Sequence, residues 1–309
     1  MPDHECTTGA RIAFRRQVRS LAVVTGLLVL CFGRSQLQLL AFSMHSELFS
    51  YIPLIPFISA YLIWSERKRL SLEIVPSRLG AGAFGAWGTA LLAGYWMATR
   101  SGWHPAEQDY LSLMTLALLC FFWGACMATL GWKVMRQALF PAAFLIFAVP
   151  LPTVWMDNID TFFQYTSAVA AHGFFWLCGT PTVRNGLDLH LPDFALTVAP
   201  ECSGIHSTLV LFMTSLMAGY LFLNRAWTRA VLVLAVIPLA ILRNGFRICV
   251  VGELCVHISH DMIRSPIHRK GGPIFFALSL IPFLLFLLYL RKFNSTAPGR
   301  QAIKPEPQS

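Results

Sequence analysis

The residues best suited to chemistry begin with a cysteine at the start of a predicted helix. Cys202 lies in the run Pro200-Glu-Cys-Ser-Gly204, directly before a long apolar stretch. At a helix N-terminus the macrodipole and free N–H groups lower the pKa of a thiol, and those N–H groups can also stabilise an oxyanion. Ser203 and Gly204 keep the turn small enough for a substrate backbone to approach. We therefore predict that Cys202 is a nucleophile; the alternative is a small buried cysteine with Ser203 as N-cap.

A pair of arginines ends the next predicted helix, in the run Arg243-Asn-Gly-Phe-Arg247. The two are four residues apart and share a helical face. This helix should run antiparallel to the cysteine helix, so its C-terminal end would meet the N-terminal end at Cys202. A guanidinium there could hold a thiolate, an oxyanion or a carboxylate. Asn244 is a supporting candidate, and the alternative is a pair of arginines extending to lipid head groups.

A histidine would complete a proton-transfer site. His268 precedes the last apolar run, and an imidazole can serve a cysteine as base and then as acid near neutral pH. His206 is its main rival, because it follows Cys202 by four residues on the same helical face. His257 and His260 are further rivals.

A metal site is the other possibility considered for these residue types. Cys249, Cys255, His257 and His260 fall within twelve residues. Their spacing, C-x5-C-x-H-x2-H, does not match the common zinc patterns. We therefore expect no metal and no other cofactor.

The elements that position these residues are apolar helices. The 309 residues are 56% hydrophobic and 13% charged, which excludes an ordinary soluble domain. The apolar runs are close to the length of about 20 residues that crosses a bilayer. The expected fold is an all-α polytopic membrane protein with about eight transmembrane helices. The predicted spans are 20–41, 46–64, 79–98, 111–132, 138–156, 203–223, 228–248 and 273–290.

Charge sets the expected topology. The net charge of +9 collects in short loops at the ends of the runs, so we assign it to membrane orientation and not to nucleic acid. Both termini are then cytoplasmic, in an inner membrane. The expected division is a cytoplasmic segment 1–19, a transmembrane domain 20–292 and a disordered tail 293–309. The basic stretch 243–270 breaks the rule by lying outside, which favours a functional role for it.

Two segments are not ordinary spans. Thr161–Cys178 is apolar on one side but contains polar residues, so it could cross the membrane, re-enter it or lie in the interface; we favour the interface. In Leu187–Leu191 the leucines alternate with polar residues at the period of a half-buried strand, and Phe194–Val198 is a second short run. We predict a small extracytoplasmic hairpin leading into Cys202.

Taken together, these residues resemble the exosortase/archaeosortase family. The resemblance rests on Ala199-Pro-Glu-Cys-Ser-Gly204, then Asn244-Gly-Phe-Arg247, then His268 before a final hydrophobic helix. The similar segments upstream are Ser50–Trp64 with Glu66–Arg69, Pro150–Pro152, Thr161–Cys178 and Gly186–Val198. The similarity extends from about residue 20 to residue 292. It implies the catalytic set Cys202, Arg247 and His268, and it leaves Arg243 as a secondary residue outside the N-x-x-R pattern.

The resemblance implies a transpeptidase that recognises a C-terminal sorting signal: a short motif often containing Pro-Glu-Pro, a transmembrane helix and a basic tail. Cys202 would form a thioester with the substrate, and an acceptor (an amine, a lipid or a glycan) would resolve it. Two alternatives stay open. One is a cysteine protease that uses water as acceptor, and the other is a non-enzymatic transporter or export scaffold.

Overall fold

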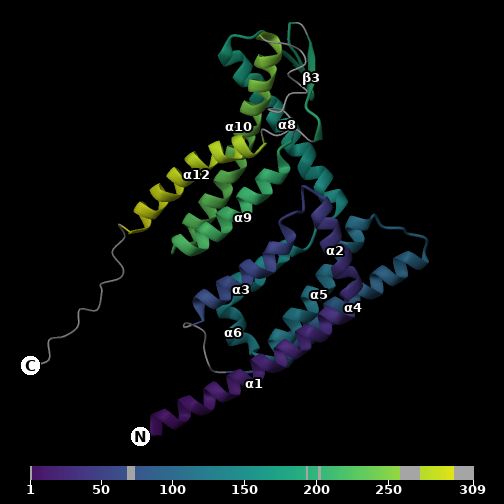
Figure 1. The fold of residues 1–309 in the computed structure, drawn as a ribbon, viewed down its shortest axis with the longest axis vertical. Coiled ribbons are helices and arrows are strands. Elements are labelled where there is room, and N and C mark those ends of the chain that lie inside the picture. Colours follow the sequence, from purple (N-terminus) through teal and green to yellow (C-terminus); the bar gives the residue numbers. More distant parts are fainter. Residues whose placement is uncertain (1, 68–73, 193, 201–202, 258–271, 296–309) are drawn as a thin grey trace, which may run out of the picture. The chain divides into compact units, whose positions relative to one another are not determined.

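The fold is known from a computed structural model, which describes residues 2–67, 74–192, 194–200, 203–257 and 272–295 (Figure 1). Most of these residues are helical, with one small three-stranded sheet. The chain divides into two compact units, residues 1–156 and 157–309. The expected all-α membrane class is confirmed at this level. Cys202 and His268 lie outside the described residues.

The first unit packs around α5 (Glu107–Thr129), which contacts α1 (Pro2–Cys31), α2 (Gly33–His45), α4 (Arg78–Arg100) and α6 (Gly131–Gln137). Half of the apolar stretch of α5 is buried, the largest share among the four helices that are long and apolar enough to cross a membrane. The rest of the unit consists of η1 (Ile52–Leu54), α3 (Ile55–Glu66), α7 (Leu139–Phe144) and η2 (Leu145–Ala148).

The segment Pro150-Leu151-Pro152 is held by polar side chains of α5. Gln108 donates from Nε2 to the Leu151 carbonyl at 2.6 Å, and Ser112 donates from Oγ to the Pro150 carbonyl at 2.6 Å. Asp109 accepts from both N and Oγ1 of Thr153, at 2.7 and 2.9 Å. Thr153 is the first residue of α8 (Thr153–Cys178), so Asp109 caps this helix from a distant part of the sequence.

The second unit contains most of α8, the strands, α9 (Ile205–Phe222), α10 (Ala226–His257) and α12 (Gly272–Ser295). Helices α9, α10 and α12 contact one another through an apolar cluster. Helices α8 and α10 approach so closely that a Cβ at Gly252 would lie 2.4 Å from Cζ of Phe175. Glycine is therefore required at residue 252 by the close approach of α8.

The sheet is antiparallel, in the order β1 (Val183–Asn185), β2 (Asp188–His190), β3 (Ala195–Thr197). Leu189 pairs with Leu196 across the two strands that were predicted as a hairpin, and both side chains are buried against α8 and α10. His190 between them is exposed, so the period of two is confirmed. Strand β1 was not predicted as a separate strand, because the residues before Gly186 carry no alternation, although the sequence from Arg184 to Pro200 was expected to be extended.

The predicted count of about eight spans is not confirmed. Four described helices (α5, α9, α10 and α12) are long and apolar enough to cross a membrane, or up to six segments if each of two bent helix pairs is one span. The predicted span 20–41 is bent by 74° between α1 and α2, and α7 with η2 meets α8 at 91°. Helix α3 has 12 residues, about 18 Å, which is short for a hydrocarbon core of about 30 Å.

Candidate active site

The turn before α9 is built around Gly204, which is the N-cap residue with φ 70° and ψ 18°. This left-handed conformation is accessible to glycine without strain. The Ser203 N–H donates to the Pro200 carbonyl at 3.0 Å, closing the turn, and Ser203 is almost fully buried. Helix α9 begins at Ile205, close to the predicted start of an apolar span at residue 203. Cys202 itself lies outside the described residues, so its place at a helix start stays a prediction.

Arg243 of α10 contacts this turn directly. Its Nη2 donates to the Gly204 carbonyl at 3.1 Å and to Oγ1 of Thr208 at 3.2 Å. Thr208 Oγ1 in turn donates to the Gly204 carbonyl at 2.9 Å. A Cβ at Gly204 would lie 3.0 Å from both Nη2 of Arg243 and Oδ1 of Asn244. The Gly204 turn can therefore approach Arg243 and Asn244 of α10 this closely because residue 204 has no side chain.

Asn244 fixes the same region to α8. Its Nδ2 donates to Oγ of Ser167 at 3.0 Å, and both side chains are buried. One residue further, a Cβ at Gly245 would lie 2.6 Å from the Cβ of Ala170. Helices α8, α9 and α10 therefore meet here: Arg243 of α10 contacts the start of α9, and Asn244 of α10 contacts α8.

The charge on Arg243 is unusual in its surroundings. The side chain is only 8% exposed, and within the described part of the chain its Nη1 is buried with no hydrogen-bond partner and no carboxylate is paired with it. A buried cation is costly unless it is paired. A helix N-terminus is itself positive, so the cation and the dipole of α9 add at this turn. Within the described residues, the acceptors for the Arg243 guanidinium are the Gly204 carbonyl and the Thr208 hydroxyl.

The other predicted residues are placed as follows. Arg247 lies one turn beyond Arg243 on α10 and is half-buried. His206, the second residue of α9, is exposed. His257 lies 14 residues beyond Arg243 on the same helix, which is about 21 Å along its axis. His257 is therefore too far along α10 to contact Arg243 or the Gly204 turn. His260 and His268 lie outside the described residues.

From the sequence, Arg243 was expected to be secondary to Arg247, and neither Thr208 nor Ser167 was a candidate. These hydroxyls hold the polar groups of Arg243 and Asn244. The available signal was the position of Thr208, which is four residues after Gly204 and so lies above it on the same helical face. Hydroxyls inside apolar helices are commonly used to join neighbouring helices.

Groups of three metal-ligand side chains occur once among the residues that the structure describes, at Cys178, Cys249 and Glu253. These residues lie toward the C-terminal ends of α8 and α10 and not at the Gly204 turn.

A family model described as transmembrane exosortase (Exosortase_EpsH) matches residues 43–285. This range runs from the end of α2 into α12 and includes Cys202, Arg243, Arg247 and His268. Neither a curated protein nor a solved structure matches the chain.

Proposed function

The chain belongs to the transmembrane exosortase family, and on this premise we propose that it is a cysteine transpeptidase that cleaves C-terminal sorting signals from surface-destined proteins. Family membership and the apolar helices establish a multi-pass membrane protein of a sorting-related transpeptidase family. The proposed substrate signal consists of a short motif of the Pro-Glu-Pro type, a transmembrane helix and a basic tail. The proposed acceptor is an amine, a lipid or a glycan.

The proposed chemistry has two steps. The Cys202 sulfur attacks the carbonyl carbon of the scissile peptide bond, the C–N bond breaks, and His268 delivers the thiol proton to the departing amine. An acceptor nucleophile then attacks the thioester and its proton passes to His268. His268 returns a proton to the leaving thiolate, which regenerates the thiol. Arg247 stabilises the oxyanion of each tetrahedral intermediate or the thiolate. No redox partner or metal is needed for this balance.

The observation that carries the proposal is the buried guanidinium of Arg243 at the Gly204 carbonyl. The positive end of the helix dipole repels a cation placed at a helix N-terminus, so the arrangement is unfavourable unless an anion is present for part of the time. A cysteine thiolate two residues from Gly204, or the oxyanion formed on its substrate, is such an anion. Arg243 is therefore a positioning and electrostatic residue in this proposal, beside Arg247 as the family residue.

The length of α10 supports a site at the lipid–water boundary. Its 32 residues extend about 48 Å, longer than a hydrocarbon core of about 30 Å. If Arg229 marks the cytoplasmic boundary, Arg243 and Arg247 lie about 21 and 27 Å further along the axis, near the opposite interface. We place that interface on the extracytoplasmic side of the inner membrane, together with the sheet, and both chain termini in the cytoplasm.

The test is processing of a reporter in cells. An exported reporter with a Pro-Glu-Pro motif, a transmembrane helix and a basic tail is co-expressed with wild type or with Cys202→Ala, Arg247→Ala or His268→Ala. All three variants should abolish removal of the tail at normal membrane levels. Cys120→Ala and His190→Ala are matched controls on α5 and β2, and they should process normally.

Three further measurements sharpen this test. Processing that survives Cys202→Ala would refute the proposed nucleophile. His206→Ala decides between the two candidate histidines, because the proposal requires that it retain activity. Mass spectrometry of the processed C-terminus separates the outcomes of the second step: a free carboxylate indicates hydrolysis by a cysteine protease, and an added mass indicates transfer to an acceptor.

A further inference from the structure

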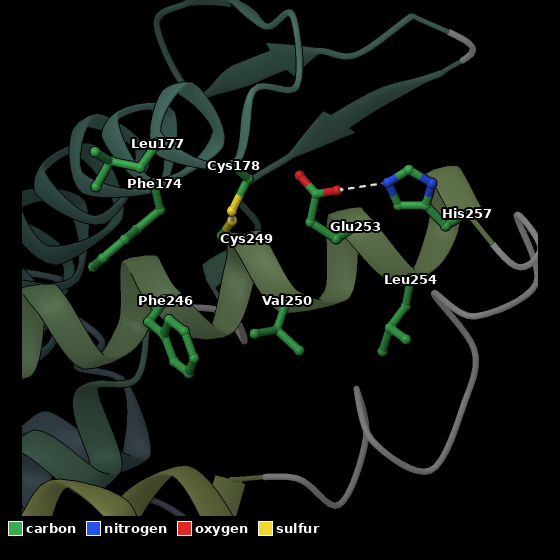
Figure 2. A pocket seen from close by; sticks show the side chains of 9 residues that line it. All are labelled: Phe174, Leu177, Cys178, Phe246, Cys249, Val250, Glu253, Leu254 and His257. Atoms are coloured by element: carbon green, nitrogen blue, oxygen red, sulfur yellow. Dashed lines mark hydrogen bonds and ion pairs between the residues drawn. The ribbon is translucent and has the colours of Figure 1, made fainter.

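A second polar cluster lies where α8 ends beside α10, away from the Gly204 turn. We define it as the α8–α10 cluster: Cys178, Cys249, Glu253 and His257. Cys178 is the last residue of α8, and the other three follow one another at intervals of four residues on one face of α10. Figure 2 shows the two sulfur atoms adjacent to each other and the Glu253 carboxylate directed toward His257.

The distances within the cluster suit one metal ion. The two sulfur atoms are 3.9 Å apart, and the ligand atoms of Cys178, Cys249 and Glu253 all lie within 4.8 Å of one another. Two thiolates bound tetrahedrally to zinc at about 2.3 Å have their sulfur atoms about 3.8 Å apart. The observed separation is therefore close to that of a zinc-bound pair.

The carboxylate and the imidazole supply the remaining positions. Oε2 of Glu253 lies 3.1 Å from Nε2 of His257, and Oε1 accepts a hydrogen bond from Thr180 Oγ1 at 2.6 Å. Ligating carboxylates are typically oriented by such outer hydrogen bonds. His257 lies outside the group of ligand atoms within 4.8 Å, so as fourth ligand its exposed side chain would have to turn toward the two sulfur atoms. A divalent cation would balance the negative charge of the two thiolates that form when it displaces the thiol protons.

The cluster is accessible. It lines one side of a pocket of about 360 Å³ whose other walls are apolar, including Phe174, Phe246 and Leu254. Cys178 and His257 are exposed, so an ion can reach the sulfur atoms from solvent. Soft thiolate ligands select zinc and similar transition metals over magnesium or calcium.

We propose that the α8–α10 cluster binds one zinc-class transition metal ion through Cys178, Cys249, Glu253 and His257. With four protein ligands the site is structural, and it clamps the C-terminal end of α8 to α10. The expectation from the sequence, that no metal is bound, rested on Cys249, Cys255, His257 and His260. The cluster in the structure keeps Cys249 and His257 and adds Cys178, which is distant in the sequence, and Glu253, which is a carboxylate; His260 lies outside the described residues.

The test uses the full chain purified in detergent, with zinc measured by mass spectrometry. Wild type should carry about one zinc ion per chain, whereas Cys178→Ser and Cys249→Ser should carry almost none. Two controls match these cysteines in exposure: Cys31→Ser for the exposed Cys178, and Cys120→Ser for the buried Cys249. Both controls should retain the metal. Equal zinc content in all five proteins, or none in wild type, would overturn the proposal.

A second measurement needs no cysteine variant. Wild type is stripped with a chelator and titrated with Co²⁺, which should produce the visible absorption typical of a tetrahedral cobalt thiolate and protect two thiols from maleimide. Thr180→Val should weaken Co²⁺ binding by about 10–100-fold, because the carboxylate loses its outer hydrogen bond. Thr182→Val is the matched control, since that hydroxyl donates only to a backbone carbonyl. Thiols that react with maleimide only after reduction would indicate a disulfide between Cys178 and Cys249 and would refute the metal site.

Discussion

Substitution of Gly204 by alanine separates the strain of a backbone conformation from the contact made by Arg243. Gly204 has φ +70°, and an added Cβ would lie 3.0 Å from Nη2 of Arg243 and from Oδ1 of Asn244. The left-handed conformation disfavours alanine by about 1–2 kcal/mol. Displacement of the guanidinium also weakens a charged hydrogen bond to a carbonyl, which contributes about 1.5–3 kcal/mol. The expected destabilisation is about 2.5–5 kcal/mol in total.

Gly186 provides a matched control within the same unit. It has φ +64° in the turn between β1 and β2, and an added Cβ there would meet nothing within 4 Å. Gly186→Ala should therefore lose only the backbone contribution, about 1–2 kcal/mol. The difference between the two variants isolates the contact of the turn with α10.

Two assays read this difference. Unfolding of purified protein by titration with sodium dodecyl sulfate, followed by tryptophan fluorescence, gives the loss of stability. Tail processing of the reporter, normalised to membrane level, gives the loss of activity, which should be nearly complete for Gly204→Ala and small for Gly186→Ala. If Gly204→Ala and Gly186→Ala lost the same stability and the same activity, the approach of Arg243 to Gly204 would have no energetic or functional consequence.

Three further expectations follow from other parts of the structure. Arg243→Met should lower the rate of tail processing by about 100-fold or more at normal membrane levels. Arg243→Lys should retain part of the activity, because it keeps a charge near the turn but loses the forked geometry of the guanidinium. Normal processing by Arg243→Met would contradict the electrostatic role. Asp109→Ala should destabilise the protein by about 0.5–2 kcal/mol through loss of the α8 cap, whereas the exposed Glu107→Ala should be nearly neutral, as measured by the same titration. Gly252→Ala should destabilise the protein by about 1–3 kcal/mol through overpacking. Gly173→Ala should be neutral or slightly stabilising, because nothing lies within 4 Å of its added Cβ. The opposite order of stabilities would contradict the close packing of α8 on α10.

The strands were predictable because their signal is local. Alternation at residues 187–191 specifies which leucines face inward, and the burial of Leu189 and Leu191 follows from it. Strand β1 lacks that pattern and forms only by pairing with β2, as Val183 does with His190. Pairing partners are set by the turn at Gly186 and by the packing of the sheet on α8, which no single strand's composition reveals.

The bends in the helices were not predictable from hydropathy. An average over the predicted span 20–41 hides the polar run Arg34-Ser-Gln-Leu-Gln38, which follows the break between α1 and α2. Likewise, Pro150 and Pro152 signal an end of helix but not its direction. The 91° turn there accompanies side chains of α5 that bond to the carbonyls of this segment, a contact across about 40 residues of sequence.

For the candidate site, the sequence indicated that the start of one helix lies beside the arginines of the next, as Gly204 and Arg243 do. It placed those arginines at the end of their helix, whereas α10 continues to His257, and it did not give the rotation of α10. Spacing alone puts Arg243 and Arg247 on one face and cannot say which of them lies against Gly204. That choice depends on how α8 and α10 pack, which Gly245 and Asn244 determine through Ala170 and Ser167. The pairing of Cys178 with Cys249 has the same origin, since both follow from the alignment of these two helices.

The buried guanidinium of Arg243 also constrains how the protein is made. An arginine at the centre of an apolar helix opposes insertion into lipid by about 2.5–3.5 kcal/mol. Its acceptors, the Gly204 carbonyl and the Thr208 hydroxyl, belong to α9, which leaves the ribosome earlier and is joined to α10 by a link of three residues, 223–225. Helices α9 and α10 should therefore enter the bilayer as a pair, with the earlier helix serving as the template that makes insertion of the later one favourable.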